Sequence, residues 1–171
     1  ILAGLAQSLA AEFAIDPGRV FVAGLSAGGA MAALLALRYP EVFAAIGVHS
    51  GVPAGAAFDV VSGLAAMRGE AAPRAGGAPP AARTIVFQGS EDAVVRPVNA
   101  ERIVAGLGEG RERQGKASGR RYRRRVFEGG RGELWLVEGL GHAWSGGRAP
   151  GSYTDPAGPD ASAEMVRFFL A

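Results

Sequence analysis

The sequence predicts an α/β fold in which a mostly parallel sheet lies between two layers of helices, as a three-layer sandwich. Short apolar and β-branched runs alternate with helical segments along the chain, as they do in strand–helix–strand units. Turns rich in glycine and other small residues separate these runs. One pair of runs is joined by a short glycine turn and must therefore be antiparallel. We expect about four parallel strands and one antiparallel hairpin strand.

The first fifty residues predict two helices and two strands. Over residues 1–15, apolar residues recur at spacings of three and four, which predicts an amphipathic helix on Leu2, Leu5, Leu9 and Phe13. Residues 19–24 and 44–49 read as strands. The helix expected between them, over 27–39, is nearly apolar all round, which predicts that it is buried.

The middle of the chain predicts a surface excursion followed by a strand and a helix. Residues 51–82 are rich in Ala, Gly and Pro, with a short helix expected around Val60–Arg68 and with Pro79-Pro80 closing the segment. This excursion could serve as a small lid. A strand over 84–89 leads to a helix over 98–107.

The last third predicts the antiparallel strand. Residues 108–120 read as a polar loop that carries the chain back across the sheet. A strand over 121–127 then joins a strand over 133–139 through the turn at 128–132. A final helix is expected over 161–170.

Composition indicates one compact domain over residues 1–171. The chain is 49% hydrophobic and 20% charged, which suits a soluble domain with a substantial core. It has no cysteine, which excludes disulfides, thiolate metal sites and a cysteine nucleophile in these residues. No apolar run reaches the length of a membrane span.

A basic cluster raises the question of a nucleic-acid partner. Eight of the 18 basic residues lie between Arg111 and Arg125. Such a cluster can bind nucleic acid, but only Tyr122 within it could stack on a base. Basic side chains on an exposed edge strand also discourage edge-to-edge pairing. We favour the solvated edge and expect no nucleic-acid partner.

A strand–turn–helix segment carries a candidate serine nucleophile. The expected strand over 19–24 ends at Gly24, Ser26 follows two residues later, and small residues begin a helix, which is the G-x-S-x-G pattern in its proper context. Ser26 is expected in a strained conformation that Gly24 and Gly28 permit because they lack bulk. The segment fits neither the dinucleotide pattern G-x-G-x-x-G nor a phosphate-binding P-loop.

A candidate acid and base follow two later strands. Asp92 comes after the strand over 84–89, and His142 comes after the strand over 133–139. Because the carboxyl ends of parallel strands share one edge of a sheet, the three side chains can converge there. Histidine would take the serine proton, and the acid would orient the ring. Glu91 is the rival for the role of acid. We expect Leu25, His49 and Trp144 to line a substrate pocket, although a merely packed His49 is an equally open alternative.

Three sequence blocks resemble the polyhydroxybutyrate (PHB) depolymerase-like esterases of the α/β-hydrolase superfamily. These blocks are Ile15-Asp-Pro-Gly-Arg-Val-Phe-Val-Ala-Gly-Leu-Ser-Ala-Gly-Gly-Ala-Met31, Phe87-Gln-Gly-Ser-Glu-Asp92 and Gly139-Leu-Gly-His-Ala-Trp-Ser-Gly-Gly147. The chain order Ser, Asp, His is also that of α/β-hydrolases. The resemblance implies a triad of Ser26, Asp92 and His142. It also implies a bacterial, secreted, extracellular or periplasmic hydrolase of carboxylic esters that needs no cofactor and no metal, with a small-molecule or polymeric ester as substrate. Related groups act on feruloyl or acetyl esters.

The resemblance also implies an oxyanion hole of which this chain shows one part. The backbone N–H of Ala27, directly after the serine, would be one donor. The family's second donor comes from an early loop near a His-Gly pair, and only one helix precedes Ser26 here. We therefore expect a C-terminal part of a longer protein, lacking N-terminal strands and the oxyanion loop. The strand over 19–24 would then have lost a neighbour on one side. Both its faces are apolar and its middle carries no charge or proline, so it is not built as an edge strand.

Two other functions fit the same residues. A serine peptidase or a thioesterase would use the same triad, because all three reactions are acyl transfers. A non-catalytic binding module could keep the pocket without turnover.

Overall fold

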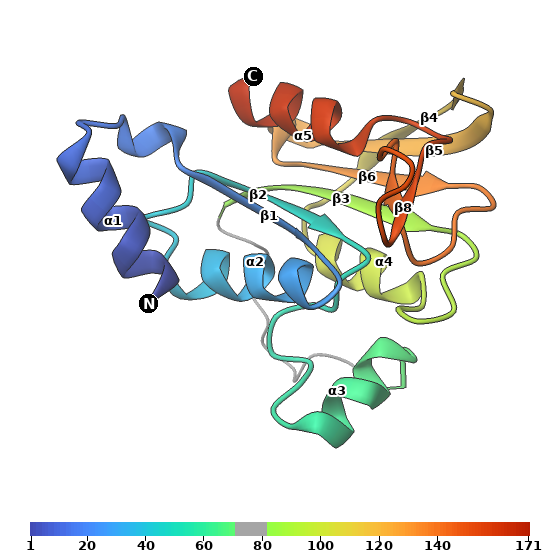
Figure 1. Cartoon of the computed structure of the whole chain (residues 1–171), viewed down its shortest axis with the longest axis horizontal. Coiled ribbons are helices and arrows are strands. Elements are labelled where there is room, and N and C mark those ends of the chain that lie inside the picture. The colour runs from blue at the N-terminus through green and yellow to red at the C-terminus, as the bar shows by residue number, and fades with distance from the viewer. Residues whose placement is uncertain (71–81) are drawn as a thin grey trace.

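The computed structural model describes residues 1–70 and 82–171. In these residues a twisted sheet lies between helices on its two faces (Figure 1). The helices and strands are, in chain order, α1 (Leu2–Glu12), β1 (Phe21–Leu25), α2 (Ala27–Arg38), β2 (Ala45–His49), α3 (Val60–Met67), β3 (Arg83–Gly89), α4 (Val98–Val104), β4 (Gly110–Ala117), β5 (Arg120–Phe127), β6 (Gly132–Val137), β7 (Trp144–Ser145), β8 (Thr154–Asp155) and α5 (Ala161–Leu170). Short 3-10 turns lie at Pro17–Arg19 and Glu128–Gly130.

The main sheet has the strand order β1-β2-β3-β6-β5-β4. Strands β1, β2, β3 and β6 are parallel, and β5 is antiparallel to β6 and β4. The predicted mostly parallel α/β sheet is therefore confirmed. The carboxyl ends of the four parallel strands lie on the same side of the sheet, as their arrowheads show in Figure 1. The candidate catalytic residues all follow these carboxyl ends, which together form the carboxyl edge of the sheet.

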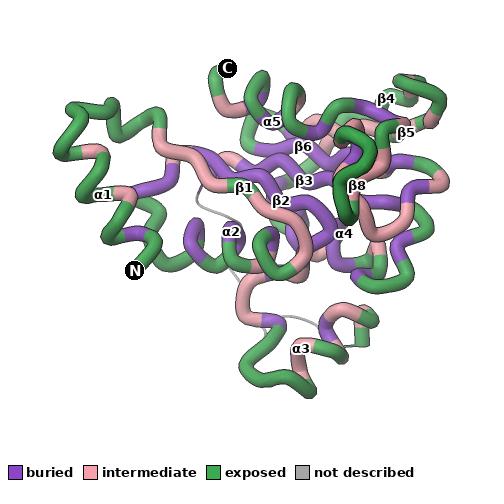
Figure 2. The backbone as a smooth tube through the Cα atoms, viewed as in Figure 1, coloured by how far each residue is buried: buried purple, intermediate pink, exposed green. Residues whose placement is uncertain are grey.

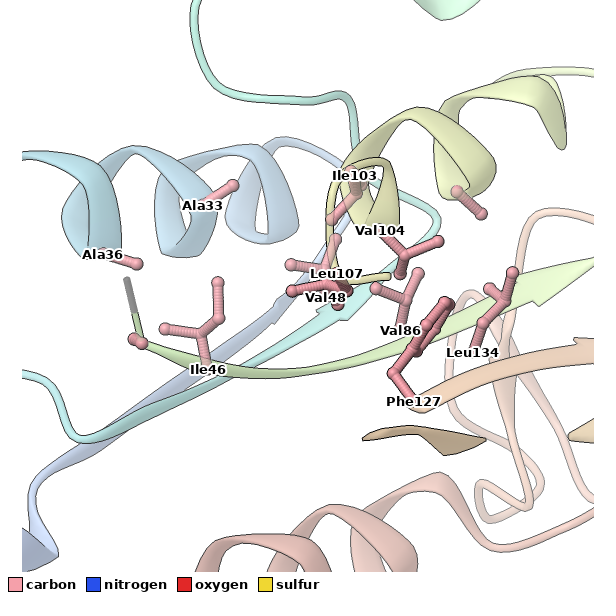
Figure 3. Packing of buried hydrophobic residues seen from close by; sticks show 12 residues of the cluster. Ala33, Ala36, Ile46, Val48, Val86, Ile103, Val104, Leu107, Phe127 and Leu134 are labelled. Carbon is pink, nitrogen blue, oxygen red and sulfur yellow. The ribbon is translucent and has the colours of Figure 1, made fainter. Parts of the chain in front are cut away.

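The core forms on both faces of the sheet, as expected for parallel strands covered by helices. Figure 3 shows one face, where Ile46, Val48 and Val86 pack under Ala33 of α2 and Ile103 of α4. On the other face, α5 packs through Met165 and Phe168 on a second cluster, whose strand members are Ala45, Ile85, Phe87, Trp135 and Val137. β2 is buried at all five positions because it lies between covered neighbours.

The expected polar loop over 108–120 is wrong, because residues 110–117 form β4. It pairs with β5 over eight residue pairs, from Gly110–Phe127 to Ala117–Arg120. Ser118 and Gly119, with φ of 43° and 92°, form the two-residue turn of this hairpin. The polar composition of the segment had predicted a loop instead. The segment does carry the chain across the sheet as expected, but it does so as a strand. β4 forms one edge of the sheet. The expectation that the basic strand over 121–127 is the edge strand is therefore wrong, because β5 lies between β4 and β6.

The expected packing of the first two helices is also partly wrong. On α1 the leucines face solvent, with Leu2 and Leu5 about half exposed, while Ala3 is buried. Small residues allow the closest approach of a helix to its neighbour, so α1 packs through its alanines on Leu35 and Phe43. Helix α2 is not buried all round, since one face is exposed, namely Met31, Leu34 and Leu37.

β1 forms the other edge of the sheet, opposite β4. Figure 2 shows it as partly exposed, in contrast to the buried β2 beside it. Its Ala23 is exposed, and the strand contains no charged residue. β1 thus has the unprotected edge character that its sequence predicted.

Helix α3 confirms the short helix expected around residues 60–68, and it lies beyond the layer of α2 and α4 (Figure 1). A capping box of Asp59 and Ser62 begins it. Its last turn is tied to the start of α4 and to the segment before it, because Met67 O accepts from Arg96 N at 2.8 Å and Ala66 O accepts from Asn99 Nδ2 at 2.9 Å. Pro79-Pro80 lies outside the described residues, and the lid role stays a prediction.

Candidate active site

The turn between β1 and α2 holds Ser26 in a strained backbone conformation, with φ of 56° and ψ of −117°. This confirms the strain predicted from the G-x-S-x-G pattern. A Cβ on Gly24 would overlap the backbone of Gly28, so only glycine fits at position 24. A Cβ on Gly28 would meet nothing within 4 Å, so the expectation that Gly28 is needed for its small size is wrong.

Gly29 and His49 hold this turn against β2. A Cβ on Gly29 would lie 3.0 Å from the carbonyl oxygen of Gly24 and 3.2 Å from that of His49, closer than ordinary contacts allow. The N–H of Ser26 donates to the carbonyl oxygen of His49 at 2.9 Å. The candidate nucleophile therefore sits on a backbone whose position is set by the end of β2.

Asp92 is buried and held by hydrogen bonds from four groups. Its Oδ1 accepts from the N–H groups of Val94 at 3.0 Å and Val95 at 2.8 Å. Its Oδ2 accepts from Gln88 Nε2 at 3.1 Å and lies 2.9 Å from His142 Nδ1. These donors leave the carboxylate one orientation, which is the requirement for a group that orients a histidine ring.

The turn that carries His142 is bonded to the turn that carries the acid. Leu140 O accepts from the N–H of Glu91 at 3.0 Å, and Ser90 Oγ accepts from the N–H of Gly139 at 2.9 Å. A Cβ on Gly89 would overlap the carbonyl oxygen of Leu140, so the last residue of β3 must be glycine for the two turns to meet. The turns after β3 and β6 thus form one rigid unit.

The structure joins the candidate acid to the candidate base. His142 Nδ1 bonds to Asp92, whereas the side chain of the rival Glu91 is exposed. Because Nδ1 faces the acid, Nε2 is the nitrogen that remains to exchange a proton. Within residues 1–70 and 82–171, Ser26 Oγ makes no hydrogen bond, so Ser26 and His142 share the edge but are not bonded to each other. Such contacts are commonly long in unliganded sites and tighten when substrate binds.

His49 is fully buried, so its expected contact with substrate is wrong for this structure. The open alternative, a packed histidine, is what the structure has. Burial lowers the pKa of His49 to about 3, so the ring is neutral. Trp144 and Leu25 are each partly exposed at the carboxyl edge, and their pocket roles stay predictions. The indole Nε1 of Trp144 donates to Ser162 Oγ at 3.1 Å.

Gln88 is a site residue that the sequence analysis missed. It is fully buried, and its Nε2 donates to Asp92 and to Val95 O, the latter at 2.9 Å. The available signal was a lone amide at the end of the apolar run Ile85-Val86-Phe87. A polar residue inside a buried strand needs partners, and here the partner is the candidate acid.

A metal-binding group and a membrane-spanning helix are both absent from the part of the chain that the structure describes. No group of three or more His, Cys, Asp or Glu side chains in residues 1–70 and 82–171 is arranged to hold a metal ion. In the same residues, no helix has the length and apolar character to cross a membrane.

Residues 2–108 match the family model described as esterase PHB depolymerase. The chain belongs to this family. It is 50% identical over 44 residues to a poly(3-hydroxybutyrate) depolymerase of Ralstonia pickettii, covering 26% of this chain and 9% of that protein. It is 31% identical over 112 residues to poly(3-hydroxyalkanoate) depolymerase C of Paucimonas lemoignei, covering 58% of this chain and 27% of that protein. The chain thus spans well under a third of these relatives.

Solved structures of esterases share the fold. An acetyl xylan esterase from Aspergillus awamori superposes with a TM-score of 0.70 at 21% identity, covering 99% of this chain and 66% of that one. A PHB depolymerase from Penicillium funiculosum superposes with a TM-score of 0.63 at 20% identity, covering 90% and 52%. The α/β-hydrolase fold expected from the sequence is therefore confirmed.

Proposed function

We propose that this chain carries the serine site of an esterase, which hydrolyses carboxylic esters through an acyl-serine intermediate. The observation that carries the proposal is the hydrogen-bonded pair of Asp92 and His142 at the sheet edge where β1 delivers a strained Ser26. Membership of the esterase PHB depolymerase family supports the same reaction class.

Each residue has a defined part in the proposed reaction. Ser26 Oγ attacks the ester carbonyl carbon while its proton passes to His142 Nε2, and Asp92 stabilises the resulting imidazolium. The carbonyl oxygen becomes an oxyanion. As the carbon–oxygen bond to the leaving group breaks, the Nε2 proton moves to the departing alcohol. Water then attacks the acyl-serine by the same route, which releases the acid and restores Ser26.

In this proposal the backbone N–H of Ala27 donates to the oxyanion. It is the first residue of α2, so its N–H has no acceptor within the helix. The positive end of the helix dipole points to the same place, where negative charge develops. Ala27 is exposed, which leaves its surroundings open to substrate. It would supply one of the two donors that such sites use.

For substrate we propose short-chain acyl esters, or esters within a polyester or linked to a polysaccharide. The relative named as a PHB depolymerase supports a polyester substrate, and the one named as an acetyl xylan esterase supports acyl esters linked to a polysaccharide. A peptidase or thioesterase on the same fold would use the same residues, and a binding module would lack an activated serine. We further propose an extracellular or periplasmic location, for which the family is the support.

Active-site labelling tests the proposal directly. A fluorophosphonate probe should label the protein at Ser26, and p-nitrophenyl butyrate should be hydrolysed. Ser26→Ala should abolish labelling, and it should lower the hydrolysis rate by several orders of magnitude, as should His142→Ala. The double variant should be little worse than either, because the residues act as a unit. Ser8→Ala, on the exposed surface of α1, is the matched control and should behave as wild type. Full turnover by Ser26→Ala would overturn the mechanism.

A further inference from the structure

His49 is a buried histidine that the proposed reaction does not use. It ends β2, between the strand that leads to Ser26 and the strand that leads to Asp92. Its ring lies between two aromatic rings, with centroid distances of 5.8 Å to Phe87 and 5.1 Å to Trp144. Both ring nitrogens have a hydrogen-bond partner, as a buried polar side chain requires, and the partners show which segments the ring joins.

The two contacts define the tautomer of the ring. The N–H of Ser145 donates to Nε2 at 3.1 Å, and an N–H can only donate, so Nε2 carries no proton. The ring proton of neutral His49 is therefore on Nδ1, which lies 3.2 Å from Ser50 Oγ and donates to it. Burial keeps the ring in this neutral form, in which one nitrogen accepts and the other donates.

The contact to Ser145 reaches the segment that carries the base. Residues 143–147 directly follow His142, and their other hydrogen bonds run to Gly141 and to residues 153–162. Trp144 N donates to Tyr153 O at 2.8 Å, and Ser145 Oγ donates to Pro159 O at 2.7 Å. Among the hydrogen bonds of the described residues, the bond from Ser145 N is the one that ties this segment to β2.

The other end of the same residue holds the nucleophile. The carbonyl oxygen of His49 accepts from Ser26 N at 2.9 Å, so the backbone of His49 positions the turn after β1. Its side chain positions the segment that follows His142. One residue of the central sheet is therefore bonded both to Ser26 and to the segment that follows His142.

We propose that His49 is a positioning residue, which fixes His142 relative to Ser26 by holding the N–H of Ser145. The inference rests on the proposed esterase function of the same site. Without this acceptor, the N–H of the fully buried Ser145 would be unpaired, and residues 142–145 would have to move to satisfy it. A displacement of about 1 Å in such a site can lower the rate about a hundredfold.

Three variants separate positioning from packing. His49→Phe keeps a flat ring for stacking but removes the acceptor. His49→Gln keeps an amide oxygen that can reach Ser145 N, so it is the rescue variant. Trp135→Phe is the matched control, because Trp135 stacks on Phe87 at 5.2 Å within the same aromatic row, while its indole N–H donates to Glu133 and not to the segment after His142.

Hydrolysis of p-nitrophenyl butyrate by the protein that contains this chain is the first measurement. His49→Phe should lower kcat about tenfold to a hundredfold and leave KM within about twofold, because substrate binding does not use the buried ring. His49→Gln should recover most of kcat. Trp135→Phe should lower the thermal midpoint and leave kcat unchanged. If His49→Phe does not fold, His49→Asn takes its place, since its shorter amide cannot reach Ser145. If His49→Phe, or His49→Asn in its place, folds and has the wild-type kcat, the inference is overturned.

The second measurement does not depend on turnover. The 171 residues contain two histidines, so His49→Phe or His49→Asn leaves His142 as the one imidazole among them. Its Nδ1 proton, bonded to Asp92, should give a downfield NMR signal that broadens in these variants and stays sharp in His49→Gln. Identical signals in all variants would overturn the inference. If the wild-type protein neither hydrolyses the ester nor labels at Ser26, the proposed function fails while this measurement still tests the positioning.

Discussion

Acidification from pH 7 to pH 5 should destabilise this protein through His49. The folded pKa of His49 is about 3, whereas the ordinary value is 6.5, and the cause is burial. Below pH 6.5 His49 takes up a proton in the unfolded chain, whereas in the folded chain it does so only at about pH 3. The folded state therefore loses stability as the pH falls through this interval. Each pH unit is worth about 1.4 kcal/mol, so His49 should cost about 2 kcal/mol at pH 5.

Guanidinium unfolding at pH 7, 6 and 5 measures this loss. The wild-type protein should lose stability over this range, and His49→Gln should lose about 2 kcal/mol less because glutamine does not titrate. The largest influence on Glu133 is burial, which opposes ionisation, but ion pairs with Arg124 and Arg167 outweigh it and lower the pKa of this carboxyl. Its contribution is present above its unfolded value of 4.5 and disappears as the pH falls below that value. It therefore lies outside the measured range. Parallel stability curves for wild type and variant would refute the argument for a neutral, buried ring.

Three further outcomes are expected. Asp92→Asn should lower kcat for ester hydrolysis by about 10²–10⁴, whereas Glu91→Gln, at an exposed residue, should change kcat little. The reverse ranking of the two variants would assign the role of acid to Glu91. Gly24→Ala should prevent folding or abolish labelling of Ser26, because its Cβ would overlap the backbone of Gly28. Gly28→Ala has room for its methyl group and should fold. Circular dichroism and probe labelling measure both outcomes. A short-chain acyl ester should have a higher kcat/KM than a matching peptide amide, since the Ala- and Gly-rich sequence of residues 51–82 offers little to recognise a peptide. A preference for the amide would favour a peptidase.

The sequence by itself determined the parallel strands and the order of the candidate residues along the sheet edge. Each of β1, β2, β3 and β6 is an apolar run bounded by turn residues, and a buried parallel strand needs no more specification than that. The strain at Ser26 was also predictable, because a strand and a helix joined by G-x-S-x-G leave the serine little other conformation. Because successive residues point in different directions, the sequence predicted that only one of Asp92 and Glu91 would reach His142, and the structure joins Asp92 to it.

Only the tertiary structure decided the features that depend on a distant partner. β4 is a strand because β5 pairs with it, and its own charged sequence resembles a loop. The leucines of α1 face solvent because the helix packs on Leu35 and Phe43 through its alanines. His49 is a neutral buried residue because Ser145, 96 positions later, packs against it. Local patterning specifies an element and its apolar face, whereas the packing of segments far apart in sequence decides what that face meets.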